Sequence, residues 1–184
     1  TSNLCSELTL PTGIDKDGKE RTAVCCLSSL NLETYNEWKN EPDFIEDVMR
    51  FLDNVLSDFI NRAPDSFHNA KYAAARERSV GLGVMGLHSF LQKESIPLES
   101  VMSKVWNNKI FKHIQTGVDS ASKKLSEERG PCPDAEEYGF KERFSNKTAI
   151  APTASISIIC GGASPGVEPI AANSYTHKTL SGSY

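Results

Sequence analysis

The sequence predicts a single α/β segment, in which extended stretches near both ends flank two long helices. Two observations lead to this prediction. Apolar residues recur at helical spacing over residues 43–61 and 99–129, whereas residues 1–10, 22–27 and 148–151 are short apolar runs bounded by turn-forming residues. The chain has 184 residues, of which 39% are hydrophobic and 24% charged, which fits one unit with its own core. No repeat or flexible linker divides it, so residues 1–184 are expected to lack an internal domain boundary.

The N-terminal elements are predicted to be extended. Residues 1–10 are predicted as a strand, and the polar stretch 13–18 as a turn that leads into a second strand over residues 22–27. Together these elements predict a hairpin-like pair of strands.

Three polar residues alternate along the first predicted strand. In an extended chain Asn3, Cys5 and Glu7 point to one side, which brings an amide, a thiol and a carboxylate onto one face. The same residues also fit a surface amide, a buried thiol and a solvated acid near a chain end. The alternation alone therefore leaves both interpretations open.

The central elements are predicted helices. The apolar stripe over residues 43–61 is wide, so this helix is expected to be mostly buried, and it must end before Pro64. Shorter helices are predicted over residues 70–77 and 87–93, and the longest over residues 99–129, just before Gly130 and Pro131.

The glycines between the two shorter helices form a literal G-x-G-x-x-G at Gly81, Gly83 and Gly86. A dinucleotide fingerprint follows a strand, opens a helix and precedes an acidic residue by about 20 positions. Here a predicted helix comes first, and the next acids, Glu94 and Glu99, lie at a different spacing. We therefore expect glycines that permit a tight turn and close packing of strand against helix.

The C-terminal region begins with a predicted strand over residues 148–151, which enters a loop of small and hydroxyl residues over 151–166. Such a loop leaves backbone N–H groups accessible, and a concavity of this kind suits a phosphate. The hydroxyls of Thr153, Ser155 and Ser157 would add donors. A plain Gly/Ser loop without a ligand remains the alternative.

Composition and charge limit the possible functions. The formal net charge is -4, so no global basic field favours nucleic acid or anionic lipid. No apolar run approaches the roughly 18 residues of a membrane span, and no secretion signal is visible, so a cytoplasmic location is expected. The 5 cysteines include no C-x-x-C and no zinc-finger spacing, so no metal site is expected and the thiols should be reduced.

Three motifs, taken together, resemble the catalytic large (α) subunit of ribonucleoside-diphosphate reductase. They are N-L-C-S-E over residues 3–7, A-V-C over 23–25 followed by L-S and N-L, and A-P-T-A-S-I-S over 151–157 followed by G-V-E-P. Their order and separation match that family, and the similarity extends over essentially the whole chain, including residues 78–84. The resemblance implies part of a ten-stranded α/β barrel, incomplete in this chain, and an internal piece of a longer subunit.

The resemblance also implies roles for individual residues. Cys5 matches the cysteine that becomes a transient thiyl radical and takes hydrogen from C3′ of the ribose. Glu7 matches the carboxylate that removes the 3′-hydroxyl proton, and Asn3 the amide that holds the ribose hydroxyls. Cys25 matches one of two cysteines that supply reducing equivalents when the 2′-hydroxyl leaves as water. Cys26 would point the other way in a strand and is expected to pack.

The loop residues Thr153, Ala154, Ser155 and Ile156 match those that hold the substrate diphosphate. Ala154 stands where some relatives carry a Glu, so backbone N–H groups are expected to make that contact.

The implied partners lie largely outside this chain. The resemblance implies a ribonucleoside diphosphate substrate, the remaining segments of the α subunit, and a thioredoxin or glutaredoxin system. Leu4 favours class I over adenosylcobalamin-dependent class II, because class II enzymes more often have Pro at this position. In class I a metal-containing β subunit generates the radical. This segment is expected to bind no cofactor or metal, and allosteric ATP and dNTP sites are expected elsewhere. The isolated chain is expected to be inactive, and an inert fragment that only associates with itself or with complementing segments is the alternative.

Overall fold

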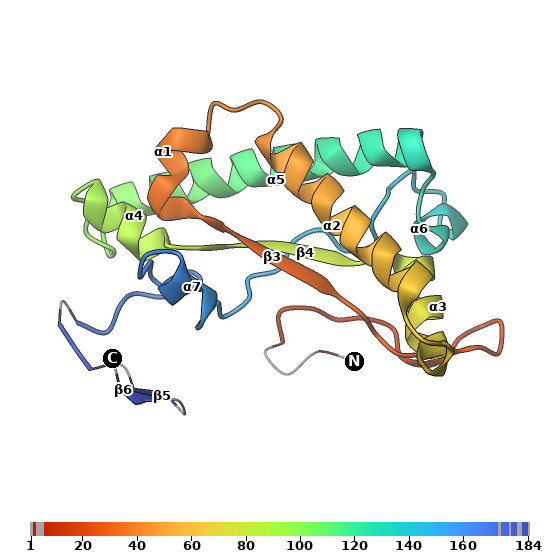
Figure 1. Cartoon of the computed structure of the whole chain (residues 1–184). Helices are drawn as coiled ribbons and strands as arrows, with labels where there is room; N and C mark the ends of the chain where they lie inside the picture. The colour runs from red at the N-terminus through yellow and green to blue at the C-terminus, as the bar shows by residue number, and fades with distance from the viewer. Residues whose placement is uncertain (1, 3–5, 173, 177, 180–181, 184) are drawn as a thin grey trace.

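Two parallel strands form the centre of the fold in the computed structural model, which describes residues 2, 6–172, 174–176, 178–179 and 182–183 (Figure 1). Strand β3 (Cys26–Asn31) pairs with β4 (Val80–Met85) from Cys26 opposite Val80 to Asn31 opposite Met85. Residues 146–149 add a third parallel segment along β4, where Thr148 forms a bridge with Leu82. The predicted strand over 148–151 is thus confirmed only at its start.

Two long helices cover one face of this strand pair (Figure 1). Helix α2 (Phe44–Arg62) and helix α5 (Val101–Arg129) lie within two residues of their predicted bounds. Ser100 begins α5 by accepting the Ser103 N–H at 3.1 Å. Because side chains alternate along a strand, Val80, Leu82 and Val84 share the face toward the helices, and all are buried. They form the core with Met49, Leu52 and Leu56 of α2 and Ile110, Val118 and Leu125 of α5.

The glycine stretch is a strand, which the sequence interpretation missed. Helices α3 (His68–Glu77) and α4 (Leu87–Lys93) occur as predicted, but β4 runs between them. A Cβ on Gly81 would lie 2.5 Å from Leu27 Cδ2, and one on Gly83 would lie 2.0 Å from the Ala149 carbonyl oxygen. These glycines therefore permit close approach of neighbouring extended segments, and the predicted packing of strand against helix is wrong. The tight turn is confirmed at Gly86, whose φ is +78° at the start of α4.

The N-terminal region is more folded than predicted. A short hairpin does form, from β1 (Gly13–Ile14) and β2 (Glu20–Arg21), but β3 begins only at Cys26. The prediction of a strand from residue 22 is wrong, because the Thr22 N–H donates to the Asn69 carbonyl of α3 at 3.4 Å. A continuous strand over residues 1–10 is also wrong. Ser2 bridges Thr9 in antiparallel fashion, so the chain reverses direction between them, and Ser6 has a φ of +60°.

The remaining elements are short. They are the 3-10 helices η1 (Leu32–Thr34) and η2 (Asp65–Phe67), the helices α1 (Tyr35–Trp38), α6 (Pro133–Glu137) and α7 (Ile156–Ile159), and the strands β5 (Lys178–Thr179) and β6 (Gly182–Ser183). Helix α7 lies on the opposite side of the strand pair from α2 and α5 (Figure 1). Within the described residues, no helix is long and apolar enough to cross a membrane.

A buried carboxylate ties the end of α3 to the rest of the core. Asp53 of α2 is fully buried and accepts hydrogen bonds from Arg78 Nε at 2.8 Å, Arg129 Nη1 at 2.7 Å and Arg143 Nε at 2.9 Å. Burial alone would raise the pKa of Asp53, but the hydrogen bonds and positive charges of these arginines outweigh it and hold the pKa below its ordinary value. Arg78 adopts a φ of +43° at the end of α3. The cluster therefore fixes the turn that leads into β4.

Candidate functional site

Cys25 lies at the start of the parallel strand pair. It directly precedes β3, and the pairing of Cys26 with Val80 brings it beside Ser79. Burial raises the pKa of the Cys25 thiol to about 11. The nearby Cys26 and the negative charges of Glu7 and Glu77 also raise this pKa, whereas the nearby Ser79 hydroxyl lowers it. The thiol is therefore protonated at neutral pH.

Glu7 is placed in the same region as Cys25. Its carboxylate is close enough to affect the Cys25 thiol electrostatically. Its Oε2 is buried and has no hydrogen-bond partner within the described residues. Glu7 also lines a cavity of about 320 Å³, together with Thr148, Ile150 and the α5 residues Phe111 and Ile114. An acceptor without a partner at the edge of a cavity is available to a ligand hydroxyl.

Asn3, Leu4 and Cys5 lie outside the described residues. The left-handed conformation of Ser6 nevertheless bears on the alternation that groups Asn3, Cys5 and Glu7. Alternation holds only in extended backbone, so it does not continue through Ser6 to Glu7. A common face for these three residues cannot be derived from the sequence spacing.

The surface beside Glu7 is free of bulky side chains from β4. Gly81 and Gly83 lie on the face of β4 opposite the core helices. Leu8 is buried close to Gly81, while Leu27 and Ile150 remain 40% and 38% exposed. This face is therefore covered in part and open in part.

The loop after residue 151 is held in an unusual conformation. Thr153 is buried and has a φ of +54°, and its Oγ1 accepts the Gly166 N–H at 2.7 Å. Its carbonyl accepts the Ser157 N–H at 3.0 Å, which begins α7. Left-handed backbone at a non-glycine residue is strained, and such strain is concentrated at binding and catalytic sites.

The predicted phosphate ligands differ in accessibility. Ala154, Ser155 and Ile156 are exposed, and their N–H groups precede the first hydrogen bond of α7. Ser157 is buried, and its hydroxyl donates to the Ala154 carbonyl at 3.4 Å. The side chains of Thr153 and Ser157 thus shape the loop, and the accessible donors are backbone N–H groups and the Ser155 hydroxyl.

The loop lies at the other end of the strands from Cys25. Ser164 anchors it there, because its carbonyl accepts the Gly86 N–H at 2.7 Å. The five steps from Val80 to Met85 span about 16 Å at roughly 3.3 Å per residue. Glu7 is connected with both ends of the strands. Its charge acts on the Cys25 thiol, and it lines the same cavity as Ile150, which directly precedes the loop.

Sequence reasoning missed two neighbours of Cys25, namely Ser79 and Glu77. Glu77 ends α3 and Ser79 directly precedes β4, and no sequence signal marks either as a neighbour of Cys25, because β4 has no alternating pattern. Among the described residues, no group of three or more His, Cys, Asp and Glu side chains has a geometry that holds a metal ion.

The chain is similar to known families and proteins. Residues 1–142 and 134–184 match the family model described as the ribonucleotide reductase barrel domain. The chain is 46% identical over 183 residues to the ribonucleoside-diphosphate reductase large subunit of Invertebrate iridescent virus 3, covering 100% of this chain and 28% of that protein. It is 36% identical to the vitamin B12-dependent ribonucleoside-diphosphate reductase of Thermoplasma acidophilum, covering 86% and 21%.

The fold agrees with a solved relative. The class Id ribonucleotide reductase alpha subunit of Actinobacillus ureae is similar with a TM-score of 0.84 and 40% identity, covering 95% of this chain and 32% of that one. The chain therefore spans less than a third of the length of each of these three relatives.

Proposed function

Because this chain belongs to the ribonucleotide reductase barrel-domain family, we propose that it forms part of the substrate-reducing site of a ribonucleoside-diphosphate reductase large subunit. The observation that carries the proposal is the proximity of Glu7 to Cys25, two residues matched to the same reaction, beside a cavity. Each of these relatives is about three times as long as this chain or longer, so turnover is proposed for this chain only as part of a complete subunit.

Residues 1–184 are proposed to be one segment of a ten-stranded α/β barrel. The parallel arrangement of β3, β4 and residues 146–149, with α2 and α5 on one face, supports this role. The barrel is not closed in this chain. Within the described residues, β3 has no strand on its outer edge, and further segments of the subunit would pair there.

In the proposed reaction, Cys5, Glu7 and Asn3 act on the C3′ side of the ribose. Cys5, as a transient thiyl radical, takes hydrogen from C3′ of the ribose. Glu7 accepts the 3′-hydroxyl proton, a role supported by its buried Oε2 without a partner in the described residues, and Asn3 holds the ribose hydroxyls.

Cys25 is proposed as a source of reducing equivalents. Cys25 and a second thiol outside this chain give up their hydrogens and join as a disulfide, while the 2′-hydroxyl leaves as water and C2′ gains a hydrogen. The raised pKa of Cys25 keeps its thiol in the protonated form that this step uses.

The loop over Thr153, Ala154, Ser155 and Ile156 is proposed to hold the diphosphate. Accessible backbone N–H groups before α7 support this assignment. The exposed side chain of Ala154 contributes no charge, so the phosphate contact is made by the backbone and by Ser155.

We place the subunit in class I because of Leu4, with the radical supplied by a metal-containing β subunit. The matched relatives include both class Id and vitamin B12-dependent enzymes. The further proposed partners are a thioredoxin or glutaredoxin system, which reduces the disulfide, and the rest of the α subunit, with a cytoplasmic location.

Reduction of a ribonucleoside diphosphate tests the proposal. The chain alone should form no deoxynucleotide, and the chain supplied with the missing α segments and a radical-generating β subunit should form it. In that assembly Cys5→Ser and Cys25→Ser should abolish turnover with the physiological reductant, whereas Cys26→Ser should retain it. Full activity of Cys5→Ser would remove Cys5 from the mechanism.

The open edge of β3 favours a second candidate, an inert segment whose only property is association through this edge. Assembly with the complementing segments without any turnover, under conditions where an intact relative is active, would support this candidate.

A further inference from the structure

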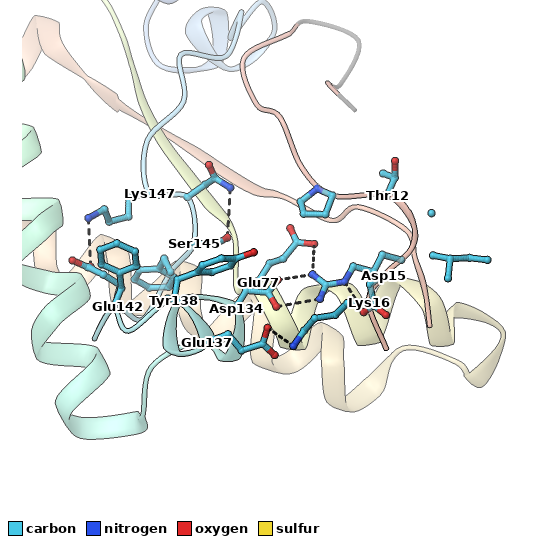
Figure 2. A pocket seen from close by; sticks show the side chains of 18 residues that line it. Thr12, Asp15, Lys16, Glu77, Asp134, Glu137, Tyr138, Glu142, Ser145 and Lys147 are labelled. Carbon is cyan, nitrogen blue, oxygen red and sulfur yellow. Dashed lines mark hydrogen bonds and ion pairs between the residues drawn. The ribbon is translucent and has the colours of Figure 1, made fainter. Parts of the chain in front are cut away.

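A second cavity is larger than the one beside Glu7, and its wall includes Glu77, a neighbour of Cys25. It has a volume of about 590 Å³ and is formed by the β1–β2 hairpin, the end of α3, helix α6 and the segment that follows it. This volume falls within the range of small-molecule sites. Figure 2 shows Glu77, Asp134 and Glu137 directed toward the same space from α3 and α6.

Among the described residues, Glu77 is a buried acid with a long ion pair to Arg21 but no hydrogen bond within 3.5 Å. The Glu77 residue is 1% exposed, and both of its carboxylate oxygens are buried without a hydrogen-bond partner within the described residues. The nearest cation is Arg21, whose Nη1 lies 3.6 Å away, beyond hydrogen-bond distance. An acid buried in this way is costly unless another group supplies donors.

The basic side chains of the cavity are already paired with other acids. Arg21 donates to Asp15 at 3.1 Å and to Asp134 at 2.5 Å and 3.1 Å. Lys16 pairs with Glu137 at 2.9 Å. Rearranging these pairs to satisfy Glu77 would leave another acid without a partner.

Lys147 is likewise paired, with Asp119 at 2.5 Å and Glu142 at 3.4 Å. In all, the cavity is lined by five acids and three bases. Asp134 and Glu137 are also paired with Arg76, so Glu77 is the lining acid whose buried oxygens lack hydrogen-bond donors within the described residues.

The rim provides apolar and aromatic surface. Tyr138 and Phe140 are 80% and 64% exposed and line the cavity, and Ile14 is 78% exposed on the hairpin side. Aromatic faces attract cations as well as alkyl groups. A ligand with a cationic head and a short apolar part would use both features.

We propose that this cavity binds a compact organic cation, a guanidinium or primary ammonium group, whose N–H donors pair with the Glu77 carboxylate while its apolar part lies against Tyr138 and Phe140. This site does not depend on the proposed reductase activity, because it uses none of the residues assigned to that reaction.

The proposal predicts a defined pH dependence. Burial raises the pKa of Glu77 to about 7, the negative charge of Asp134 adds to this, and Arg21 opposes it. A bound cation favours the ionised carboxylate, so binding should tighten as pH rises through 7. The ionised fraction grows from about 10% at pH 6 to about 90% at pH 8, which sets an upper limit of about tenfold on the change.

Neighbouring groups should not reproduce this effect. Arg21 stays charged and the Cys25 thiol stays neutral over this pH range, since its pKa is about 11. Among the described residues, the charged or titratable groups that face Glu77 are Arg21 from β2, Asp134 from α6 and Cys25 just before β3.

The test is an NMR titration of the full 184-residue chain with ethylguanidinium and, separately, with ethylurea, its uncharged analogue of similar shape. Ethylguanidinium should bind saturably, shift the signals of Glu77 and Tyr138, and bind several-fold more tightly at pH 8 than at pH 6. Ethylurea should bind at least about tenfold more weakly. Glu77→Gln should weaken ethylguanidinium binding by a similar factor, whereas Glu99→Gln, an exposed acid away from the cavity, should not change it.

Equal binding of the two probes, no saturable binding of ethylguanidinium, or unchanged binding by Glu77→Gln would overturn the proposal. If Glu77→Gln fails to fold, the carboxyl ¹³C signal of Glu77 in the unaltered chain gives the answer. Its titration midpoint must fall when ethylguanidinium is added, and a midpoint that stays constant would refute the pairing.

Discussion

Replacing Asp53 by Asn should cost about 3–5 kcal/mol of the free energy of unfolding, the typical loss when one partner of a buried ion pair is removed. Asp53 is fully buried on α2, and its carboxylate accepts five hydrogen bonds from the guanidinium groups of Arg78, Arg129 and Arg143. Asn keeps one acceptor oxygen and turns an NH₂ group toward these donors.

The magnitude depends on which arginines are left buried. Arg78 and Arg143 are 8% and 9% exposed, so each would lose a charged partner in a place that water barely reaches. The Arg129 side chain is 33% exposed and can recover hydration. The loss should therefore come mainly from Arg78 and Arg143, at about 1.5–3 kcal/mol per hydrogen bond to a charged group, reduced by relaxation.

Urea unfolding followed by circular dichroism measures this loss as a lower midpoint at unchanged slope. Asp58→Asn is the matched control, because Asp58 lies on the same helix and pairs at 3.3 Å with Arg62 where both side chains are exposed; it should cost less than about 0.5 kcal/mol.

The pH dependence gives a second check. The folded pKa of Asp53 lies below its ordinary 3.8, so its contribution is fully present above about pH 4 and is lost as pH falls through the folded value. Asp53→Asn should therefore be most costly near neutral pH and less so in strong acid. A loss near pH 7 no larger than that of Asp58→Asn would refute the assigned role of the cluster.

Three further predictions follow from packing and ionisation. Gly83→Ala should lower the free energy of unfolding by about 2 kcal/mol or more, because its Cβ would meet the Ala149 carbonyl oxygen at 2.0 Å. The control is Gly13→Ala, which has open space around the new Cβ but a φ of +81°, and it should lower the free energy of unfolding by only about 1 kcal/mol. A similar loss for both variants would contradict the packing argument. Leu125→Ala, at a fully buried site, should lose about 2–5 kcal/mol in the same urea assay, and a loss under about 1 kcal/mol would mean that the site is not packed. At pH 8 iodoacetamide should label the exposed Cys160 well before Cys25, whose pKa, raised from 9.0 to about 11, leaves roughly a hundredfold less thiolate than an ordinary thiol. Equal labelling of the two cysteines in a peptide map would argue against the raised pKa.

The long helices could be predicted from the sequence because their apolar residues recur at helical spacing over several turns. In α2 the buried residues Ile45, Met49, Leu52 and Leu56 recur at three- and four-residue spacing, and one apolar stripe specifies one face. Strand β4 gave no comparable signal. All six of its residues are buried, two are glycines, and neither alternation nor β propensity marks such a strand.

The candidate site was predicted by residue type more than by geometry. The motifs indicated Glu7, Cys25 and the 153–156 loop as candidates, but the left-handed conformation of Thr153 depends on a distant contact. Thr153 is held by Gly166, thirteen residues later, and local sequence does not encode such a contact. Glu77 is the last residue of the predicted helix over 70–77, and its burial depends on the hairpin and α6, which are distant in sequence.

The pairing of β3 with β4 also bears on how the chain folds. Cys26 meets Val80, so the paired residues are 54 positions apart, whereas those of the β1–β2 hairpin are 6 to 8 apart. Closing the longer loop costs about 2 kcal/mol more in chain entropy. Helices α2 and α3 lie inside that loop and shorten it as they form. Helix formation should therefore precede strand pairing, and the surface beside Cys25 would be among the last parts of the molecule to assemble.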